Sequence, residues 1–269
     1  DVRDRDRLLS ATENIDTIVH AAALKQVMTA EYNPIEFIKT NILGAENLIN
    51  ASIKNNVKRV IALSTDKAAA PINMYGASKL VSDKLLIAGN HIKGNRDIIF
   101  SIVRYGNVLG SRGSIIPFFK ELVDKGVKNL PLTDERMTRF VIKIEEGIKF
   151  VFNGLEKMEG GEIFVPKLPS IKIIDLIRAF TGGDHYDLIG IRPGEKLHEV
   201  MIPKEESLNC LEMKNFYVIQ PMLTWWERSK NNQEYTETVK KIINPFEYAS
   251  NTNKDFLDIN KIKELIKKV

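Results

Sequence analysis

The alternation of strand-like and helix-like segments in the first part of the chain limits its fold more than any other feature. Apolar runs at residues 16–23, 59–64 and 98–104 predict buried strands, and residues 35–54 and 74–90 predict helices between them. Isoleucine and alanine recur in the first helical segment at the spacing of an amphipathic helix. Strands that alternate with helices form a parallel sheet with right-handed crossovers. The sequence therefore predicts an α/β fold, in which ligands bind beyond the carboxyl ends of the strands.

The rest of the chain has a looser pattern. Beyond residue 108, glycines and prolines divide it into short elements, with helix-like segments at 144–156 and 171–181 and a strand-like run at 162–165. Short elements separated by such residues are typical of turns and connections. We expect a smaller, irregular α/β domain beside the main sheet.

Composition excludes several classes of protein. A single cysteine, Cys210, excludes an internal disulfide framework and favours a reducing, cytoplasmic setting. No apolar run approaches the ~20 residues that cross a bilayer, so we expect no membrane segment. The net charge of +4 is spread along the chain, which allows an anionic small substrate but does not indicate a nucleic-acid partner. His91, His185 and His198 lack metal-ligand spacing, so no metal site is expected.

The glycine pattern bears on dinucleotide binding. A dinucleotide-binding sheet carries a glycine-rich turn between its first strand and first helix. Gly106, Gly110 and Gly113 are spaced differently and follow a late strand, so they do not form that turn. Either the chain binds no dinucleotide or it begins after the turn. The acidic start at Asp1, with no strand before it, favours the second interpretation.

Polar residues gather at the predicted end of the strand at 59–64. Thr65, Asp66 and Lys67 follow this strand, where the reacting groups of a parallel sheet belong. Tyr75 and Lys79 lie four residues apart, so on one helix they share a face. A nearby ammonium lowers the pKa of a phenol from about 10, and such a tyrosine can take a proton from a sugar hydroxyl as hydride leaves the carbon. Asp66 with Lys67, or Tyr75 with Lys79, would by itself indicate a pair on the protein surface. Together the two pairs favour a catalytic site.

Several stretches together resemble the extended short-chain dehydrogenase/reductases. They are Asp1–Asp4, His20–Lys25, Thr40–Asn41, Ser64–Lys67, Pro71–Lys79, Arg104–Asn107 and Gly110–Gly113. More narrowly, they resemble the inverting UDP-N-acetylglucosamine 4,6-dehydratases of the pseudaminic-acid pathway, over essentially the whole chain. Retaining sugar-nucleotide 4,6-dehydratases usually carry glutamate where Lys67 stands. Members of the family begin with a glycine-rich strand-turn-helix, and we expect that this chain lacks that segment.

The resemblance implies a Rossmann-like, doubly wound parallel sheet, shortened at its N-terminus, with a smaller irregular α/β substrate domain. Residues 1–108 would form the cofactor-binding domain, joined by residues 140–166. Residues 109–139 and 167–269 would form the domain that binds the nucleotide sugar.

The resemblance also implies NADP as the cofactor. Asp1 and Val2 would meet its adenine, and the loop of Ala21, Ala22 and Ala23 would pass near it. Further contacts with the cofactor would come from Lys25, Tyr75, Lys79 and Tyr105. The substrate-binding residues would be Asn107, Arg112, Arg139, Arg192 and Glu195. Of these, Arg192 stands beside Pro-Gly in a loop where a guanidinium can hold a diphosphate.

The implied chemistry divides the remaining residues by role. Tyr75, supported by Lys79 and the Thr65 hydroxyl, would oxidise C4 of the hexose. Lys67, as a neutral amine, would remove the C5 proton, and protonated Asp66 would assist departure of the C6 hydroxyl. The assignment of protons between Asp66 and Lys67 stays open, because adjacent titrating groups share their proton states.

The implied function is NADP-dependent dehydration of UDP-N-acetylglucosamine to the C5-inverted 4-keto-6-deoxy sugar, as the first step of pseudaminic-acid synthesis for flagellin or surface glycosylation. We expect a cytoplasmic lyase that forms a homo-oligomer. One alternative is a sugar-nucleotide 4-epimerase, which needs the tyrosine but has no use for Asp66 and Lys67. The other is a non-catalytic, truncated chain that only binds a nucleotide sugar, and the missing glycine turn favours it.

Overall fold

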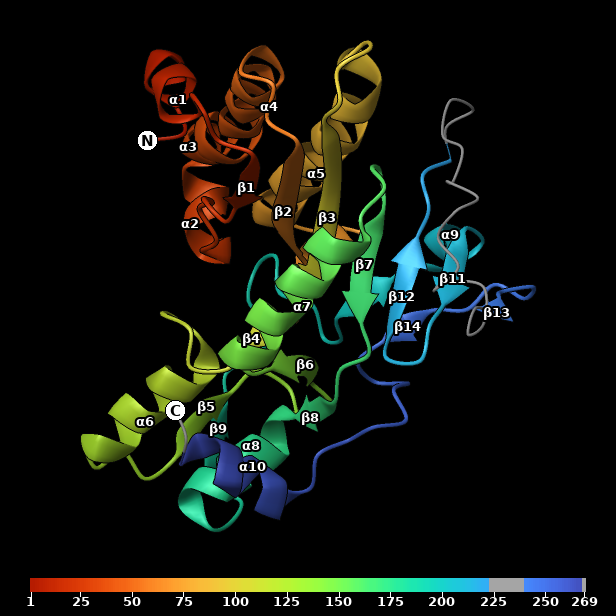
Figure 1. Ribbon diagram of the computed structural model, residues 1–269. Coiled ribbons are helices and arrows are strands. Elements are labelled where there is room, and N and C mark those ends of the chain that lie inside the picture. Colours follow the sequence, from red (N-terminus) through yellow and green to blue (C-terminus); the bar gives the residue numbers. More distant parts are fainter. Residues whose placement is uncertain (223–239, 268–269) are drawn as a thin grey trace.

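The structure is a computed structural model that describes residues 1–222 and 240–267 (Figure 1). Its largest element is a seven-stranded sheet of order β1-β2-β3-β7-β12-β11-β13. The first four strands in this order are parallel to one another, and each of the last three is antiparallel to its neighbours. In chain order they are β1 (Thr17–His20), β2 (Arg59–Thr65), β3 (Ile99–Tyr105), β7 (Ile163–Pro166), β11 (Cys210–Glu212), β12 (Phe216–Ile219) and β13 (Lys240–Lys241).

Helices pack on both faces of this sheet (Figure 1). Successive residues of a strand point to opposite faces, so Ile61 of β2 packs with Val151 of α7, while its neighbour Val60 packs with Leu86 of α5 on the other side. Burial on both faces explains why β2 and β3 read as continuous apolar runs. The helices of this part are α1 (Arg5–Ala11), α2 (Val27–Tyr32), α3 (Pro34–Phe37), the π-helix η1 (Ile38–Leu43), α4 (Gly44–Lys54), α5 (Met74–Ile92) and α7 (Ile144–Lys157).

The second part of the chain is smaller and irregular. Its core holds Ile116, Phe119, Leu176 and Ile262 from three helices that pack together. Figure 1 places these helices at the opposite end of the molecule from α1 and α4. The elements are β4 (Asn107–Val108), α6 (Ile115–Asp124), β5 (Leu130–Leu132), β6 (Thr138–Ile142), β8 (Ser170–Lys172), α8 (Ile173–Thr181), β9 (Tyr186–Leu188), β10 (Val200–Ile202), α9 (Lys204–Ser207), β14 (Tyr248–Ala249) and α10 (Ile259–Ile266).

The predicted α/β fold with a parallel sheet is confirmed, and the three predicted strands correspond to β1, β2 and β3. Two details differ from the sequence analysis. The helix expected at 35–54 is divided by the π-helix η1. Strands β11, β12 and β13 lie within residues 167–269, which we assigned wholly to the smaller domain, yet they extend the central sheet, because β12 pairs with the open edge of β7.

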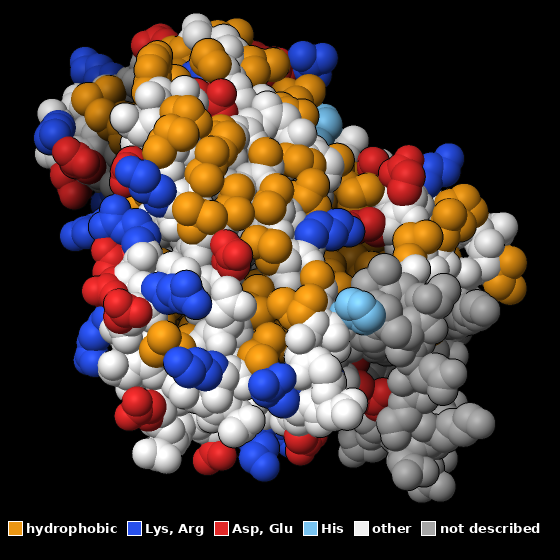
Figure 2. Space-filling model, turned by 90° about the horizontal axis from the view of Figure 1, so that it is seen from above, with side chains coloured by type: hydrophobic (Ala, Val, Ile, Leu, Met, Phe, Trp, Pro, Cys, Tyr) orange, Lys and Arg blue, Asp and Glu red, His pale blue; other side chains and the backbone are white. Residues whose placement is uncertain are grey.

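Charged side chains of both signs are interspersed with hydrophobic ones on the face seen in Figure 2. In the part of the chain that the structure describes, no helix combines the length and the apolar character that crossing a bilayer requires.

Candidate active site

The carboxyl end of β2 begins the site. The strand ends at Thr65 and continues into a short 3₁₀ turn, η2 (Asp66–Ala68), in which Thr65 accepts a hydrogen bond from the Lys67 backbone N–H. Asp66 is fully buried, and its Oδ1 accepts hydrogen bonds from the Thr65 hydroxyl at 2.9 Å and from Lys67 Nζ at 3.0 Å. The turn therefore holds a carboxyl and an amine side by side at the end of a central strand.

Helix α5 supplies the tyrosine and lysine pair. Asn73 caps this helix, because its side chain accepts a hydrogen bond from the Gly76 N–H. Tyr75 and Lys79 are both buried, one turn apart, and Lys79 Nζ donates to the carbonyl of Leu63 at 2.9 Å. The helix thus places both side chains against the end of β2.

The pKa of Tyr75 does not follow the expected direction. Burial raises it to about 12, although the charge of Lys67 and a hydrogen bond with Thr65 lower it. From the four-residue spacing we expected a lysine to bring this pKa below its usual value. Desolvation of the phenolate is the larger effect, and the lowering charge comes from Lys67 rather than from Lys79.

Lys67 lies at the centre of a cluster drawn from both parts of the chain. Its Nζ contacts Asp66, Asn107 Oδ1 at 3.3 Å on β4, and Glu199 Oε1 at 3.2 Å. Burial lowers the pKa of Lys67, but Asp66 and Glu199 together raise it above the ordinary value. The ammonium form is therefore favoured, in contrast to the neutral amine that the sequence analysis expected.

Asp66 shows the complementary shift. Burial raises its pKa, and Glu199 raises it further, while Lys67 lowers it; the net direction is upward. A raised pKa favours the neutral carboxylic acid over the carboxylate.

Two residues of the cluster were not predicted. Glu199 is 2% exposed and also lies 3.6 Å from Arg139 Nε. Lys196 donates to the carbonyl of Ala69, and burial lowers its pKa. Both belong to the loop that carries Arg192, and a polar residue inside an irregular loop has no spacing signal that would identify it.

The predicted substrate residues occupy different environments. Arg139 is buried, and its guanidinium donates to the backbone carbonyls of Thr138, Lys196 and Leu197, so it links β6 to the segment that carries Glu199. Arg192 is exposed and pairs with Glu195 at 2.9 Å. Arg112 is exposed in the turn before α6. Of these five residues, Asn107 is the one that contacts Lys67 directly.

The predicted cofactor residues outside α5 lie in the loop after β1, at the end of β3 and at the start of the chain. Ala21, Ala22, Ala23 and Lys25 are exposed in the loop after β1, and the pKa of Lys25 is lowered by burial and by the charge of Lys67. Tyr105, at the end of β3, is partly buried, which raises its pKa. Farther away, Asp1 is exposed and pairs with Arg3, and Val2 packs against Gly44 of α4.

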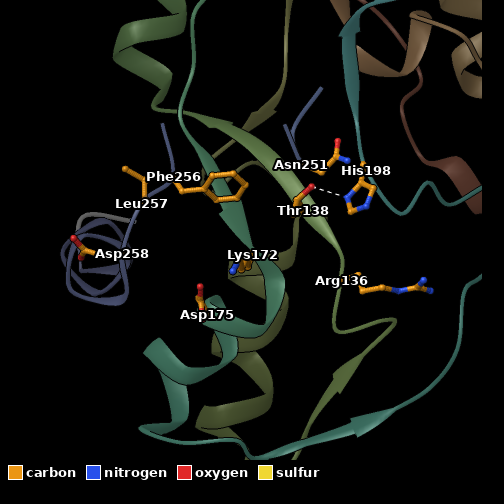
Figure 3. Close-up of a pocket in the computed structure, with 9 residues that line it drawn as sticks. All are labelled: Arg136, Thr138, Lys172, Asp175, His198, Asn251, Phe256, Leu257 and Asp258. Atoms are coloured by element: carbon orange, nitrogen blue, oxygen red, sulfur yellow. Dashed lines mark hydrogen bonds between the residues drawn. The ribbon is translucent and has the colours of Figure 1, made fainter. Parts of the chain in front are cut away.

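A separate cavity of about 650 Å³ is lined by Thr138 of β6, Lys172 of β8, Asp175 of α8 and residues of the segment 251–258 (Figure 3). Thr138 and His198 point toward one another at its edge and share a hydrogen bond of 2.8 Å. The neighbours of these two residues, Arg139 and Glu199, belong to the Lys67 cluster, and none of the predicted site residues lines this cavity.

A doubly wound α/β sheet, with a buried tyrosine and lysine on the helix that follows a central strand, defines a short-chain dehydrogenase/reductase of the extended, two-part type. Within this class, the polysaccharide biosynthesis protein family matches residues 1–221, and the chain belongs to that family.

Relatives with assigned names are similar over nearly the whole chain. A Campylobacter jejuni protein named UDP-N-acetylglucosamine 4,6-dehydratase (inverting) is 49% identical over 268 residues, which cover 99% of this chain and 80% of that protein. A Rickettsia massiliae protein named UDP-glucose 4-epimerase is 39% identical over 271 residues, which cover 99% of this chain and 78% of that protein. The crystal structure of Pen from Bacillus thuringiensis is 32% identical with a TM-score of 0.86, and the match covers 100% of this chain and 80% of Pen. The predicted resemblance to the inverting dehydratases is thereby confirmed.

Proposed function

We propose that this chain is a lyase that dehydrates UDP-N-acetylglucosamine to its C5-inverted 4-keto-6-deoxy form, with NADP as the cofactor. One observation carries the proposal: Asp66, Lys67 and Glu199 form a buried acid–base cluster beside Tyr75 and Lys79. Of the chain's own residues, oxidation at C4 needs only the tyrosine and lysine, because the cofactor would supply the hydride acceptor. Loss of water from C5 and C6 needs a further base and a further acid, and the cluster supplies both.

The residues at the carboxyl ends of β1 and β2 fit a nicotinamide cofactor. Ala21, Ala22 and Ala23 are small and exposed, so a flat ring can approach the backbone. Lys79 Nζ has three N–H donors, of which one reaches the carbonyl of Leu63, and the others can serve ribose hydroxyls. When bound, an oxidised nicotinamide would accept hydride from C4 and return it to C6, and its positive charge would lower the pKa of Tyr75.

The chain's own residues would then move the protons. Tyr75 takes the proton of the C4 hydroxyl, and the resulting ketone acidifies the hydrogen at C5. Lys67 removes this C5 proton, and Asp66 gives its proton to the C6 hydroxyl, which leaves as water. C5 regains a proton on the opposite face, which inverts this carbon, and the proton gained by Tyr75 balances the one returned to C5.

The proposal also covers how the substrate and cofactor are held, and where the enzyme acts. Arg192, Arg112 and Glu195 would hold the uridine diphosphate, while Asn107 would contact the hexose next to Lys67. Residues 1–108 with 140–166 would bind the cofactor, and the remainder would bind the substrate. The product would enter pseudaminic-acid synthesis in the cytoplasm, with the enzyme acting as a homo-oligomer.

A sugar-nucleotide 4-epimerase is the second candidate, because relatives of that name match 99% of this chain. Product mass separates the two: the purified chain, with NADP and UDP-N-acetylglucosamine, should yield a product lighter by one water. A product of unchanged mass would instead indicate epimerisation. Absence of both turnover and NADP binding would indicate a non-catalytic nucleotide-sugar-binding chain.

Replacement of Lys67 tests the role of the cluster. Lys67→Ala should abolish dehydration, with a loss of at least ~100-fold, because the C5 base is gone. NADP affinity should stay nearly unchanged. Lys84→Ala on the exposed face of α5 is the matched control and should retain activity. Normal turnover by Lys67→Ala would contradict the assignment.

A further inference from the structure

Glu199 is a buried carboxylate to which the reaction as described assigns no task. It is 2% exposed, and its Oε1 lies 3.2 Å from Lys67 Nζ. Among the residues that the structure describes, Oε2 has no hydrogen-bond partner, and the same holds for Oδ2 of Asp66. Buried polar atoms are rarely left unpaired, so this arrangement requires an explanation.

Lys67 is favoured as an ammonium, so it must lose a proton before its amine can act as a base. Its Nζ contacts two carboxyl groups, Asp66 at 3.0 Å and Glu199 at 3.2 Å. Asp66 already holds the proton that the leaving hydroxyl requires, so it has no capacity for a second one. Glu199 is the remaining carboxylate in contact with the lysine.

We propose that Glu199 takes the proton of the Lys67 ammonium and later returns it, which makes it a positioning residue that acts through Lys67; this inference rests on the proposed dehydratase function. In the first step, the ammonium and the Glu199 carboxylate become an amine and a carboxylic acid. The amine takes the C5 proton and is an ammonium again, while Asp66 loses its proton to the departing water.

The same contacts restore the starting state. After water has left, Glu199 carries a proton and Asp66 does not. Lys67 touches both groups, so it can give one proton to Asp66 and receive one from Glu199. The number of protons on the three side chains is then the same as before the reaction, with no external acid or base consumed in this step.

The surrounding charges support this starting state. Burial raises the pKa of Glu199, but Lys67, Arg139 and Lys196 lower it below the ordinary value. Burial together with Glu199 raises the pKa of Asp66. The cluster faces Arg139 on β6, Lys196 on the loop before Glu199, Asp66 on η2 and Tyr75 on α5. These directions agree with the starting state that the proposal assigns, in which Lys67 and Glu199 form an ion pair and Asp66 carries the proton for the leaving hydroxyl.

The first test measures the ionisation of Lys67 and does not depend on turnover. Lysine labelled with ¹³C at Cε reports titration of the amine by NMR, and the Lys67 signal is assigned from its loss in Lys67→Met. In Glu199→Gln, the titration of Lys67 should move to lower pH, because the carboxylate that pairs with its ammonium is removed. An unchanged titration in Glu199→Gln would overturn the proposal.

The second test separates the chemical steps in the 269-residue chain. With NADP and UDP-N-acetylglucosamine, Glu199→Gln should still produce the transient NADPH absorbance of C4 oxidation. Release of water and exchange of the C5 hydrogen with deuterated solvent should fall at least ~100-fold, and Glu199→Asp should recover part of the loss. His198→Ala, whose side chain faces Thr138 on the other side of the segment, is the matched control and should keep its rate.

The outcomes distinguish the two proposals. If the unaltered chain binds NADP and UDP-N-acetylglucosamine but releases no water, the proposed function is wrong, while the NMR titration still decides whether Glu199 sets the charge of Lys67. If the unaltered chain is active and Glu199→Gln keeps the full rate of C5 exchange, the role of Glu199 is wrong and the dehydratase assignment stands.

Discussion

Gly76 lies between helix α5 and the turn that carries Lys67, at a very close backbone contact. A Cβ at this position would lie 2.2 Å from the Lys67 carbonyl oxygen and 3.1 Å from Pro71 Cβ. Because the carbonyl belongs to the backbone, the turn would have to move. We expect Gly76→Ala to lower the free energy of unfolding by about 1–3 kcal/mol. Urea denaturation measures this loss, and the dehydration rate should fall with it because Lys67 is displaced.

Gly147 provides a matched comparison within a helix. A Cβ there would meet its nearest atom, Ile142 Cδ1, at 3.8 Å, which is an ordinary contact. Gly147→Ala should therefore gain up to about 1 kcal/mol from helix propensity. Equal stability of the two alanine variants would show that the contact at Gly76 does not constrain the turn.

Individual site residues differ in how far the sequence could predict them. Tyr75 and Lys79 could be predicted together, because a four-residue spacing on one helix is a local property. Glu199 could not, since tertiary folding alone brings it to Lys67. Arg139 was predicted to bind the substrate, and the structure adds what the sequence could not show, that its guanidinium donates to the backbone carbonyls of Thr138 and Lys196. Charge and residue type indicate what a side chain can bind, whereas burial decides what it does bind.

At the scale of elements, the π-helix η1 connects the loop after β1 to helix α5. Asn41 in this helix exchanges hydrogen bonds with the backbone of Leu24 and donates to Ser78 Oγ at 2.9 Å. Asn41→Ala removes these bonds and leaves the partly buried N–H and carbonyl of Leu24 without their partner, at roughly 1–3 kcal/mol for each such group, whereas Ser78 Oγ keeps its bond to the Tyr75 carbonyl. We expect reduced stability in thermal unfolding and faster amide hydrogen exchange at Leu24.

Asn50, on the exposed side of the neighbouring helix α4, is the control for this replacement. Asn50→Ala should be neutral or slightly stabilising, since alanine is the better helix former. If Asn41→Ala has the same effect as Asn50→Ala, the bonds to Leu24 and Ser78 contribute nothing. The sequence pattern predicted one continuous helix here, because a π segment of six residues is too short to interrupt the apolar repeat and differs from the α-helix in its hydrogen bonds.

At the scale of the whole molecule, buried charge connects the main sheet to the later part of the chain. Arg104 at the end of β3 is fully buried. Its guanidinium donates to Glu206 of α9 at 2.5 Å and to the Met201 carbonyl at 3.0 Å, and it lies 4.0 Å from Asp83.

The parallel sheet itself was predictable, because each strand and helix has its own local pattern. The extension of that sheet by β11 and β12 was not, since antiparallel pairing at a distant edge leaves no periodic signal.

Stability of the whole chain should depend on pH through His20, which is buried at the end of β1. Burial, followed by the charge of Lys79, lowers the pKa of His20 from 6.5 to about 4. In the unfolded chain the imidazole takes a proton near its ordinary pKa, whereas in the folded chain it stays neutral until about 4. The stability that His20 provides is thus fully present above about 6.5 and is lost as the pH falls toward 4.

Replacement of His20 isolates this contribution from that of the carboxyl groups, which titrate in the same range. Between pH values of about 7 and 4, the unaltered chain should lose about 3 kcal/mol more unfolding free energy than His20→Gln. Urea denaturation at several pH values measures both proteins, and the difference at neutral pH gives the packing cost of the glutamine. Parallel loss of stability in the two proteins would mean that His20 already carries its proton in the folded state, or lies where water reaches it. The larger slope is expected of the unaltered chain because its only means of charging His20 in this range is to unfold.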